Sequence, residues 1–318
     1  MSERYEEMYQ AASRYYVHAE TMETIAHHLK ISRSTVSRLL KEARDTGLVR
    51  ISLADHQGSA SPLSTALAQR FGVRVHMVSV RENANEKVRM ERVARMAGQL
   101  LTEVVEDHDV IGVAWGVTLS NVVRYLGRRP LVEATVVQVN GSANQHDSGL
   151  PYIGEIMQSF GDAFDAKAVL FPVPAFFDQT EAKSVLWRER SIQQVLRLRD
   201  QVDIAVFGVG ALKARVPSHV YSAGYMDPAE MEQLLSEGVV GDVCTVLLRE
   251  DGSYADIAYN ERATGPTPAE LAKVPRRICV VADPSRAPAL IGALRAGTAT
   301  DLVLDDGTAR AVLNRLSR

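Results

Sequence analysis

The sequence of 318 residues lacks the features that mark secreted, zinc-binding and membrane-spanning proteins. Its two cysteines, Cys244 and Cys279, lie within apolar runs, as buried thiols of a reducing compartment do. No His/Cys spacing suggests zinc. The N-terminus has no signal-peptide core, and no apolar run reaches the roughly 18 residues needed to span a bilayer. We therefore expect a cytoplasmic protein with no metal, cofactor or membrane partner.

A large net charge is also absent, since the formal charge is −3, so any contact with nucleic acid must come from a local basic surface. Such a surface is present. Between Lys30 and Arg50 the sequence has six Lys or Arg residues against two acids, Glu42 and Asp45, a local excess of four positive charges. This excess is the charge pattern expected where a protein contacts DNA.

The residues around this basic stretch predict a helix-turn-helix. Ile25, Ala26 and Leu29 share one face of a helix that begins near Thr21, and Val36, Leu39 and Leu40 share one face of a second helix. Ser32 is a good N-cap for the second helix, and "LVRISL" (48–53) follows as a wing. The side chains expected to contact DNA from this helix are Ser32, Arg33, Ser34, Thr35, Ser37, Arg38 and Lys41.

The rest of the chain has a different pattern. The polar stretch "ADHQGSAS" is the best linker candidate, so we expect a DNA-binding domain over 1–54, a linker over 55–61 and a second domain over 62–318. In the second domain, short β-branched runs alternate with helical segments, among them "VIGVAW", "DIAVFGVG", "DVCTVLL" and "ICVVA". This alternation predicts a mostly parallel α/β sheet with helices on both faces.

Polar, glycine-containing turns follow several of these strands. In "GVAWGVTLSN" a strand is expected to end at Trp115, Gly116 to make the turn, and Val117–Leu126 to form a helix whose amides, with Thr118 and Ser120, cradle an anion. Further candidates are the turns around Asn140 and Gly208, Asp242 just before a strand, and Arg286 in a first helical turn, where it would face a phosphate. No P-loop or dinucleotide fingerprint is present.

Taken together, these residues resemble the SorC/DeoR-type family of bacterial sugar-binding transcriptional regulators. The matching stretches are "AASRYYVHAETMETIAHHLKISRSTVSRLLKEARDTGLVRI", "IGVAWGVTL", "VVQVNG", "FPVPAFFD", "IAVFGVG", "GDV", "NERATG" and "LVLDDGTARAVL". The resemblance implies a winged helix-turn-helix joined to an effector domain similar to sugar-phosphate isomerases. It implies a homotetramer, a dimer of dimers, that binds double-stranded operator DNA.

The resemblance further implies a repressor or activator that a phosphorylated sugar releases. We expect a repressor of a carbohydrate or nucleoside catabolic operon, controlled by a sugar phosphate, sugar or polyol. Carried over by position, the effector pocket would use Gly116, Thr118, Asn140, Gly141, Ser142, Gly208, Gly210, Asp242 and Arg286.

The sequence departs from the family at "ADPSR" (282–286), where the family has a glycine pair followed by a lysine. Asp283 would repel a phosphate unless it turns away, so an unphosphorylated sugar or polyol is an open alternative. Asn140 cannot form an imine, which argues against covalent capture of a sugar aldehyde.

A second hypothesis is a sugar-phosphate isomerase or deaminase with an appended DNA-binding module. It needs a catalytic base at the strand ends. The candidates are scattered along the sequence, and we expect the chain not to be an enzyme; they are His146, Asp147, Asp178, Asp242 and Asp283.

Overall fold

The computed structural model describes residues 3–49, 61–144, 150–215, 218–222 and 224–317. The chain divides into two compact units, Met1–Ser59 and Ala60–Arg318, and each is described by itself. Of the expected wing over 48–53, only Leu48 and Val49 belong to the described residues, and of the expected linker only Ser61 does. The rest of both segments lies outside the described residues.

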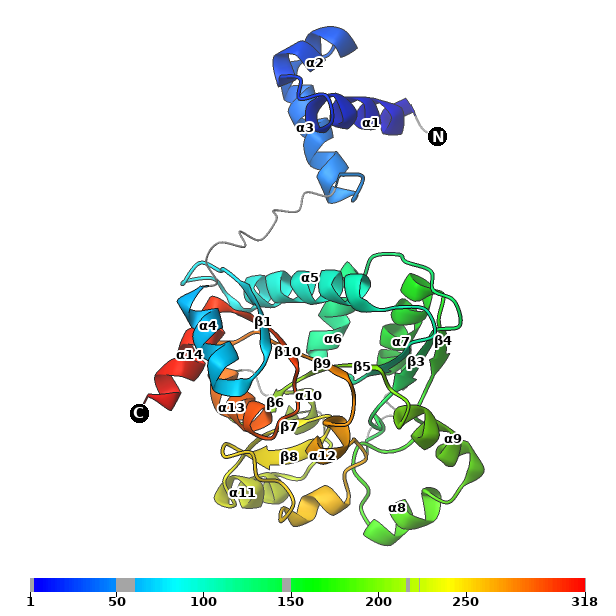
Figure 1. Ribbon diagram of the computed structural model, residues 1–318, viewed down its shortest axis with the longest axis vertical. Helices are drawn as coiled ribbons and strands as arrows, with labels where there is room; N and C mark the ends of the chain where they lie inside the picture. The colour runs from blue at the N-terminus through cyan, green and yellow to red at the C-terminus, as the bar shows by residue number, and fades with distance from the viewer. Residues whose placement is uncertain (1–2, 50–60, 145–149, 216–217, 223, 318) are drawn as a thin grey trace. The chain divides into compact units, whose positions relative to one another are not determined.

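The described part of the N-terminal unit, residues 3–49, contains three helices, α1 (Glu3–Tyr16), α2 (Met22–Leu29) and α3 (Arg33–Asp45) (Figure 1). Ser32 caps α3 as the sequence predicts, because its hydroxyl accepts a hydrogen bond from the Thr35 amide at 3.1 Å. Lys30 ends α2 in the left-handed conformation, with φ of 52°. The predicted apolar face is buried, and the core of this unit is Met8, Ala11, Ala12, Ile25, Val36, Leu39, Leu40 and Ala43.

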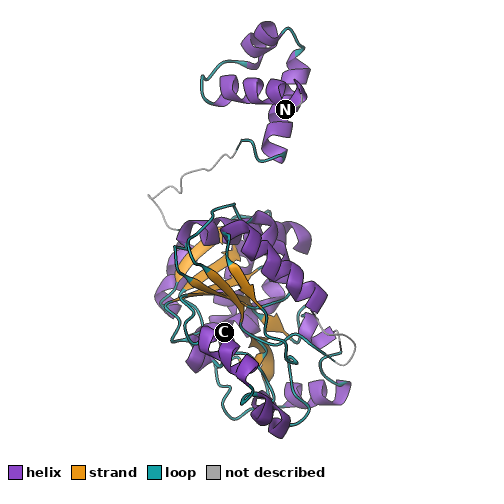
Figure 2. Ribbon diagram, turned by 90° about the vertical axis from the view of Figure 1, so that its right-hand side faces the viewer, coloured by secondary structure: helices purple, strands orange, loops and turns teal. Residues whose placement is uncertain are grey.

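Seven strands of the second unit form one sheet in the order β1-β10-β9-β5-β2-β3-β4, and every neighbouring pair is parallel (Figure 2). This confirms the predicted α/β class. The strands are β1 (Arg74–Val78), β2 (Val110–Val113), β3 (Thr135–Gln138), β4 (Lys167–Val169), β5 (Ile204–Gly208), β9 (Arg276–Val281) and β10 (Asp301–Asp305).

Helices cover both faces of this sheet because successive strand residues point to opposite sides. Ile204 and Val206 of β5 pack with α5, α6 and α7, whereas Ala205 and Phe207 pack with α4, α9, α13 and α14. The helices are α4 (Pro62–Phe71), α5 (Glu86–Val104), α6 (Val117–Val122), α7 (Leu150–Phe164), α8 (Thr180–Leu186), α9 (Arg190–Arg199), α10 (His219–Ser222), α11 (Pro228–Ser236), α12 (Pro268–Leu271), α13 (Ala287–Arg295) and α14 (Asp306–Leu316), with short 3₁₀ turns η1 (Val123–Tyr125), η2 (Ala258–Glu261) and η3 (Pro284–Arg286).

A smaller antiparallel sheet, in the order β6-β7-β8, corrects one expectation. The run "DVCTVLL" is not a single strand of the parallel sheet. It forms the end of β7 (Val239–Val243), a tight turn and β8 (Val246–Arg249), and β7 also pairs with β6 (Gly210–Ala211). The turn residues Cys244 and Thr245 both have positive φ, 50° and 70°, the geometry of a two-residue hairpin. Asp242 therefore lies within β7 rather than before a strand.

The order of strands creates a switch point between β2 and β5. After β2 the chain proceeds outward to β3 and β4, and after β5 it proceeds in the other direction to β9 and β10. Ligands in open parallel sheets bind at the carboxyl ends of the strands beside such a point. The segments that follow β2, β3, β5 and β9 are therefore brought to one edge of the sheet.

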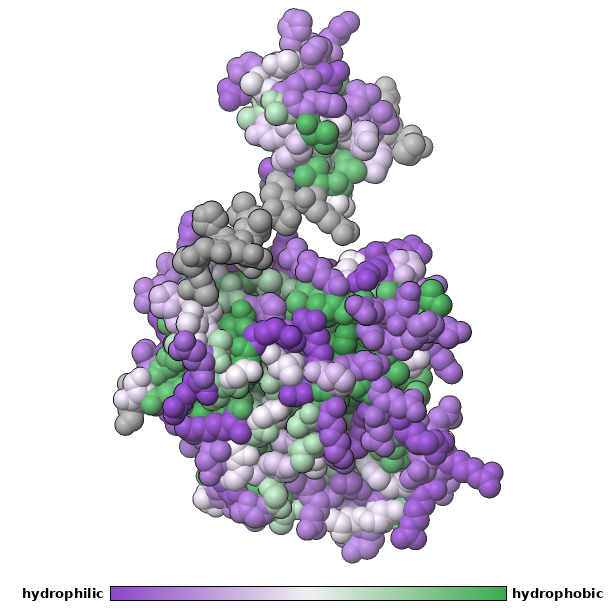
Figure 3. Space-filling model, viewed as in Figure 1, coloured by the Kyte–Doolittle hydropathy of each residue, from purple (hydrophilic) through white to green (hydrophobic). Residues whose placement is uncertain are grey.

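On the face shown in Figure 3, polar side chains cover most of the α/β unit, and apolar ones gather where α5 and α6 lie. Val88 at the start of α5 and Val117 at the start of α6 are 39% and 56% exposed. None of the described helices is both long and apolar enough to cross a membrane.

Candidate functional site

A pocket of about 350 Å³ lies at the carboxyl ends of four neighbouring strands. Its volume is within the range of small-molecule sites. Seven of the nine predicted effector residues line it: Gly116, Thr118, Asn140, Gly208, Gly210, Asp242 and Arg286. The structure therefore brings together residues that lie as much as 170 positions apart in the sequence.

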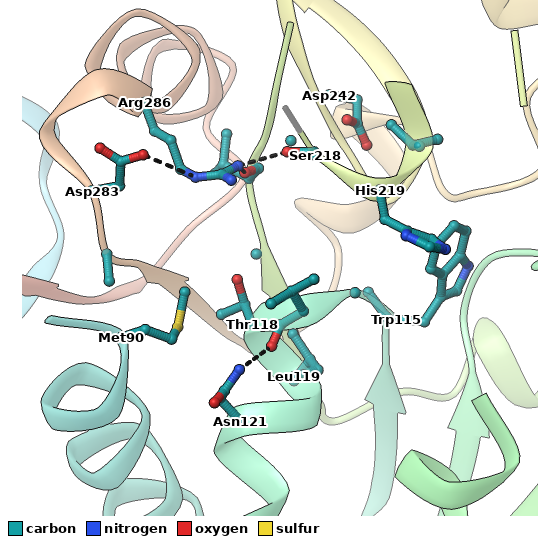
Figure 4. A pocket seen from close by; sticks show the side chains of 18 of the residues that line it. Met90, Trp115, Thr118, Leu119, Asn121, Ser218, His219, Asp242, Asp283 and Arg286 are labelled. Carbon is teal, nitrogen blue, oxygen red and sulfur yellow. Dashed lines mark hydrogen bonds and ion pairs between the residues drawn. The ribbon is translucent and has the colours of Figure 1, made fainter. Parts of the chain in front are cut away.

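Arg286 occupies one end of the pocket and points into it (Figure 4). Its Nη1 donates to the Val209 carbonyl at 3.0 Å and to the Ser218 hydroxyl at 2.6 Å, and its Nε lies 3.9 Å from Asp283 Oδ2. Burial lowers the pKa of Arg286, while the nearby carboxylates of Asp283 and Asp242 act in the opposite direction. The guanidinium thus holds the segment after β6 against the start of α13.

Asp242 reaches the pocket from β7 and is tied to the protein by two hydrogen bonds. The Tyr221 hydroxyl donates to Oδ1 at 2.7 Å and the Thr245 amide donates to Oδ2 at 2.9 Å. Burial raises the pKa of Asp242, although these two donors and Arg286 oppose the rise. A Cβ on Gly210 would lie 1.7 Å from Asp242 Oδ1, so glycine at this position leaves room for the carboxylate as it is held here.

The other end of the pocket is formed by Asn140, Thr118 and two rings. Asn140 is buried, and its Oδ1 has no hydrogen-bond partner among the described residues. The rings of Trp115 and His219 meet edge to face with centroids 6.1 Å apart (Figure 4). Tyr225, outside the lining, stacks on Trp115 at 5.3 Å. A buried acceptor beside aromatic rings is suited to a ligand that has both hydroxyl groups and C–H faces.

Two predicted residues, Gly141 and Ser142, do not line this pocket. The reason is their packing against the segment that follows β4. A Cβ on Gly141 would lie 2.1 Å from the Pro174 carbonyl, and the Ser142 amide donates to the Val173 carbonyl at 3.1 Å. Both residues therefore hold the turn after β3 in place rather than face the cavity.

The strand before Gly116 and the helix after it are both shorter than predicted. Strand β2 ends at Val113 instead of Trp115, and α6 has six residues before it tightens into η1. Gly116 has φ of 144°, so the predicted need for glycine is confirmed. Ser120 is not in the lining; its hydroxyl bonds to the Gly116 and Val117 carbonyls and to the Tyr152 hydroxyl. The predicted contribution of Ser120 to the anion cradle is therefore wrong, whereas Thr118 does line the pocket.

The three catalytic candidates that the structure describes, Asp178, Asp242 and Asp283, do not come together as a poised base. Asp178 is exposed and outside the pocket lining, and His146 and Asp147 lie outside the described residues. Asp242 and Asp283 do line the pocket, but each accepts two hydrogen bonds from the protein. Among the residues that the structure describes, no group of three His, Cys, Asp or Glu side chains is placed to hold a metal ion.

Helix α3 carries the candidate DNA-contacting side chains on one exposed surface. Ser34, Ser37, Arg38 and Lys41 are exposed, and each lies three or four residues from two of the others, the spacing of one helix face. Thr35 is half-buried and its hydroxyl accepts from Arg38 Nη2 at 3.4 Å, while the Arg33 guanidinium lies 3.6 Å from Glu23. The Ser32 hydroxyl is engaged in the helix cap.

Several lining residues had no sequence signal that identified them. Trp115 is an exception, because it directly precedes the predicted glycine turn and could have been included on that ground. Glu86, Lys87 and Met90 come from α5, and Ser218, His219 and Val220 come from the segment around the start of α10. Their positions depend on the three-dimensional packing of distant segments.

Comparison with known proteins agrees with these features. The family model described as "Putative sugar-binding domain" matches residues 55–314. The deoxyribonucleoside regulator of Bacillus subtilis (strain 168) is 29% identical over 307 residues, covering 96% of this chain and 97% of its own length. The sorbitol operon regulator of Klebsiella pneumoniae is 23% identical and covers 95% of this chain and 96% of its own length.

Two solved structures are similar as well. A domain of a possible sugar-binding transcriptional regulator from Arthrobacter aurescens TC1 is 42% identical, with a TM-score of 0.76, and the match covers 82% of this chain and all of that domain. The full-length sorbitol operon regulator SorC from Klebsiella pneumoniae, 22% identical, has the same fold, with a TM-score of 0.80 over 98% of this chain and all of its own. The chain belongs to the SorC/DeoR-type family of sugar-binding transcriptional regulators.

Proposed function

We propose that the chain is a DNA-binding transcriptional regulator whose affinity for its operator is controlled by a small polyhydroxy effector. The observation that carries this proposal is the exposed surface of α3, which presents Ser34, Ser37, Arg38 and Lys41 on a small helical unit within the same chain as the pocket. Arg suits guanine, Ser suits base edges or phosphates, and Lys suits phosphates. We propose repression as the sign of regulation.

In this proposal the domains are 1–54, a winged helix-turn-helix, 55–61, a linker, and 62–318, the effector domain. Support comes from the geometry of the first unit, in which α2 ends at Leu29 and α3 begins at Arg33 after a connection of three residues. Helix α3 would enter the major groove with its N-terminal turns, as second helices of such motifs do.

The effector would bind at the strand ends. Thr118, Asn140 and Arg286 supply polar groups there, and Trp115 and His219 supply rings. Ligand binding would favour one arrangement of effector domains in a homotetramer, a dimer of dimers, and so change the spacing of paired α3 helices on operator half-sites.

We propose that the pocket binds without turnover. Support comes from Asp242 and Asp283, because each of these carboxylates is held by two donors of the protein rather than left poised as a base. If purified protein converted sugar phosphates, the isomerase hypothesis would replace this one.

The DNA-binding half is tested by selecting duplexes from a random-sequence pool on the purified chain and measuring affinity by fluorescence anisotropy. We expect one enriched sequence that binds at least a hundredfold more tightly than a scrambled duplex, with affinity that falls as salt rises. Equal affinity for all sequences would contradict the proposal.

A further inference from the structure

Asp283 has a strained backbone at the charged end of the pocket. Its φ is 131°, a conformation that residues with a side chain rarely adopt, and its side chain is buried. The carboxylate accepts hydrogen bonds from the Ser285 amide at 2.8 Å and from the Ser285 hydroxyl at 2.6 Å. Strained residues persist only where the surrounding structure holds them, and they are frequent in ligand-binding sites. The position of this carboxylate is therefore informative about the ligand.

The Asp283 carboxylate opposes the binding of an anion at this end of the pocket. It already occupies the Ser285 amide, one of the donors that a phosphate would use at the start of η3. It also lies 3.9 Å from Arg286, whose Nη1 donates to the protein at Val209 and Ser218. A second negative charge brought beside a buried carboxylate is repelled more strongly than it would be in water.

The lining as a whole has no excess of positive charge to offset this repulsion. Among the described residues it contains three carboxylates, Glu86, Asp242 and Asp283, and two cations, Lys87 and Arg286. Lys87 is exposed and follows Glu86 directly in α5. A phosphomonoester would add about 1.5 to 2 further negative charges at neutral pH.

The opposite end of the pocket is suited to hydroxyl groups. Asn140 Oδ1 is buried and lacks a donor, and within the described part of the chain the Thr118 hydroxyl also has no partner. A hydroxyl can donate to Asn140 Oδ1, whereas a phosphate dianion has no proton to donate. Trp115 and His219 provide ring surfaces for the C–H groups that such a ligand also carries (Figure 4).

We propose that the pocket binds a neutral polyhydroxy compound, a free sugar or polyol, and that Asp283 excludes the corresponding phosphomonoester. This inference rests on the proposed function and deepens it by naming the class of effector. The neutral ligand would donate a hydroxyl to Asn140 and lie against Trp115, and its distal end would approach Asp283 and Arg286 as a hydroxyl.

The test compares free compounds with their own phosphomonoesters by calorimetry on the full chain. The probes are ribose, 2-deoxyribose, sorbitol and erythritol, each beside its phosphate. We expect at least one neutral compound to bind, with an affinity at least tenfold higher than that of its phosphate. If a phosphate binds as tightly as its neutral partner or more tightly, or if none of the neutral compounds binds, the inference is overturned.

The variant Asp283→Asn removes the charge and keeps an acceptor for the Ser285 amide. We expect this variant to raise the affinity for the phosphomonoester at least tenfold relative to the affinity for the neutral compound. We also expect inorganic phosphate to raise the Tm of the variant, and not that of the parent chain, at equal ionic strength. Asp283→Gly, which also relieves the strained φ, should behave likewise. Asp251→Asn, at a carboxylate in the turn after β8, is the matched control and should change neither value.

An unchanged preference in both Asp283 variants would overturn the inference. The proposed function is scored separately, on the duplex selected above and in the absence of any sugar. Specific DNA binding that persists while the phosphate preference is wrong refutes the effector class alone. Loss of sequence-specific DNA binding in a folded chain refutes the proposed function itself.

Discussion

In the N-terminal unit the side chains proposed to contact DNA follow one another along a single helix, from Ser32 to Lys41, whereas the pocket of the α/β unit is lined by segments from Glu86 to Arg286. The first surface depends on one helix and the three-helix core beneath it. The second depends on the register of four strands and on the packing of α5 and the small antiparallel sheet against them. The two sites should therefore fail under different mutations.

The largest expected effect comes from a Leu→Ala substitution in the hydrophobic core of one unit, which should destabilise that unit and leave the other intact. Leu39 is buried in the N-terminal unit and Leu67 is buried in the α/β unit. Leu39→Ala should cost about 2–5 kcal/mol in the free energy of unfolding of the first unit and abolish DNA binding, with ligand affinity unchanged. Leu67→Ala, the matched change, should destabilise the second unit instead. Chemical denaturation with DNA- and ligand-binding assays checks both, and identical losses in the two variants would contradict independent units.

The next effect concerns the turn after β3. Gly141→Ala places a Cβ against the Pro174 and Val173 carbonyls, so the backbone must shift. We expect a loss of about 1–3 kcal/mol in unfolding free energy, with weaker ligand binding because Asn140 moves. Gly154→Ala in α7, where a Cβ meets no atom within 4 Å, should instead stabilise the chain by up to about 1 kcal/mol. Thermal denaturation checks both variants. Equal Tm values for Gly141→Ala and Gly154→Ala would show that the turn after β3 is not tightly packed.

On the DNA-binding surface, Arg38→Ala should cost about 1–3 kcal/mol of specific binding and relax specificity at one base pair. Lys41→Ala should weaken binding to all sequences and reduce the salt dependence by about one ion. Arg190→Ala, exposed at the start of α9, is the control and should leave DNA affinity unchanged. Anisotropy titrations at several salt concentrations distinguish these outcomes, and an unaltered affinity in both α3 variants would place the DNA contact elsewhere.

At neutral pH the smallest effect concerns Asp301, because its contribution to the stability of the α/β unit changes only in acid. Burial would raise the pKa of Asp301, but hydrogen bonds from His76, Arg74 and Thr300 and the charge of Arg276 hold it well below its ordinary value. A carboxylate whose pKa is lowered on folding stabilises the fold above its unfolded pKa of about 3.9, and this contribution falls as the pH drops through the folded pKa.

The α/β unit should thus lose stability below about pH 4, by up to about 1.4 kcal/mol per pH unit from this group. Asp301→Asn should flatten that dependence in denaturation curves recorded from pH 5 to 2. Asp45→Asn, at an exposed carboxylate of α3, should leave it unchanged. A slope that survives in Asp301→Asn would assign the acid sensitivity to other groups.

The comparison of the two units also explains what could be predicted from the sequence. The cap at Ser32, the buried face of α2 and α3 and the glycine turn at Gly116 depend on neighbours within a few residues, so the sequence predicts them. The hairpin at Cys244–Thr245 was missed because its flanking apolar residues read as one strand. His219 and Tyr221 carry no local signal, since only the pairing of β6 with β7 brings their segment to the pocket.

In the proposed function, binding of the ligand and binding of the DNA are coupled through one protein. The most direct measurement is the affinity of the purified chain for its selected duplex with and without a saturating neutral ligand, together with the affinity for that ligand with and without the duplex. If the two binding events are coupled, the ligand must change the affinity for DNA by the same factor by which DNA changes the affinity for the ligand. We predict equal factors of about 5 to 150. A ligand that saturates the pocket and leaves DNA affinity unchanged would contradict the account.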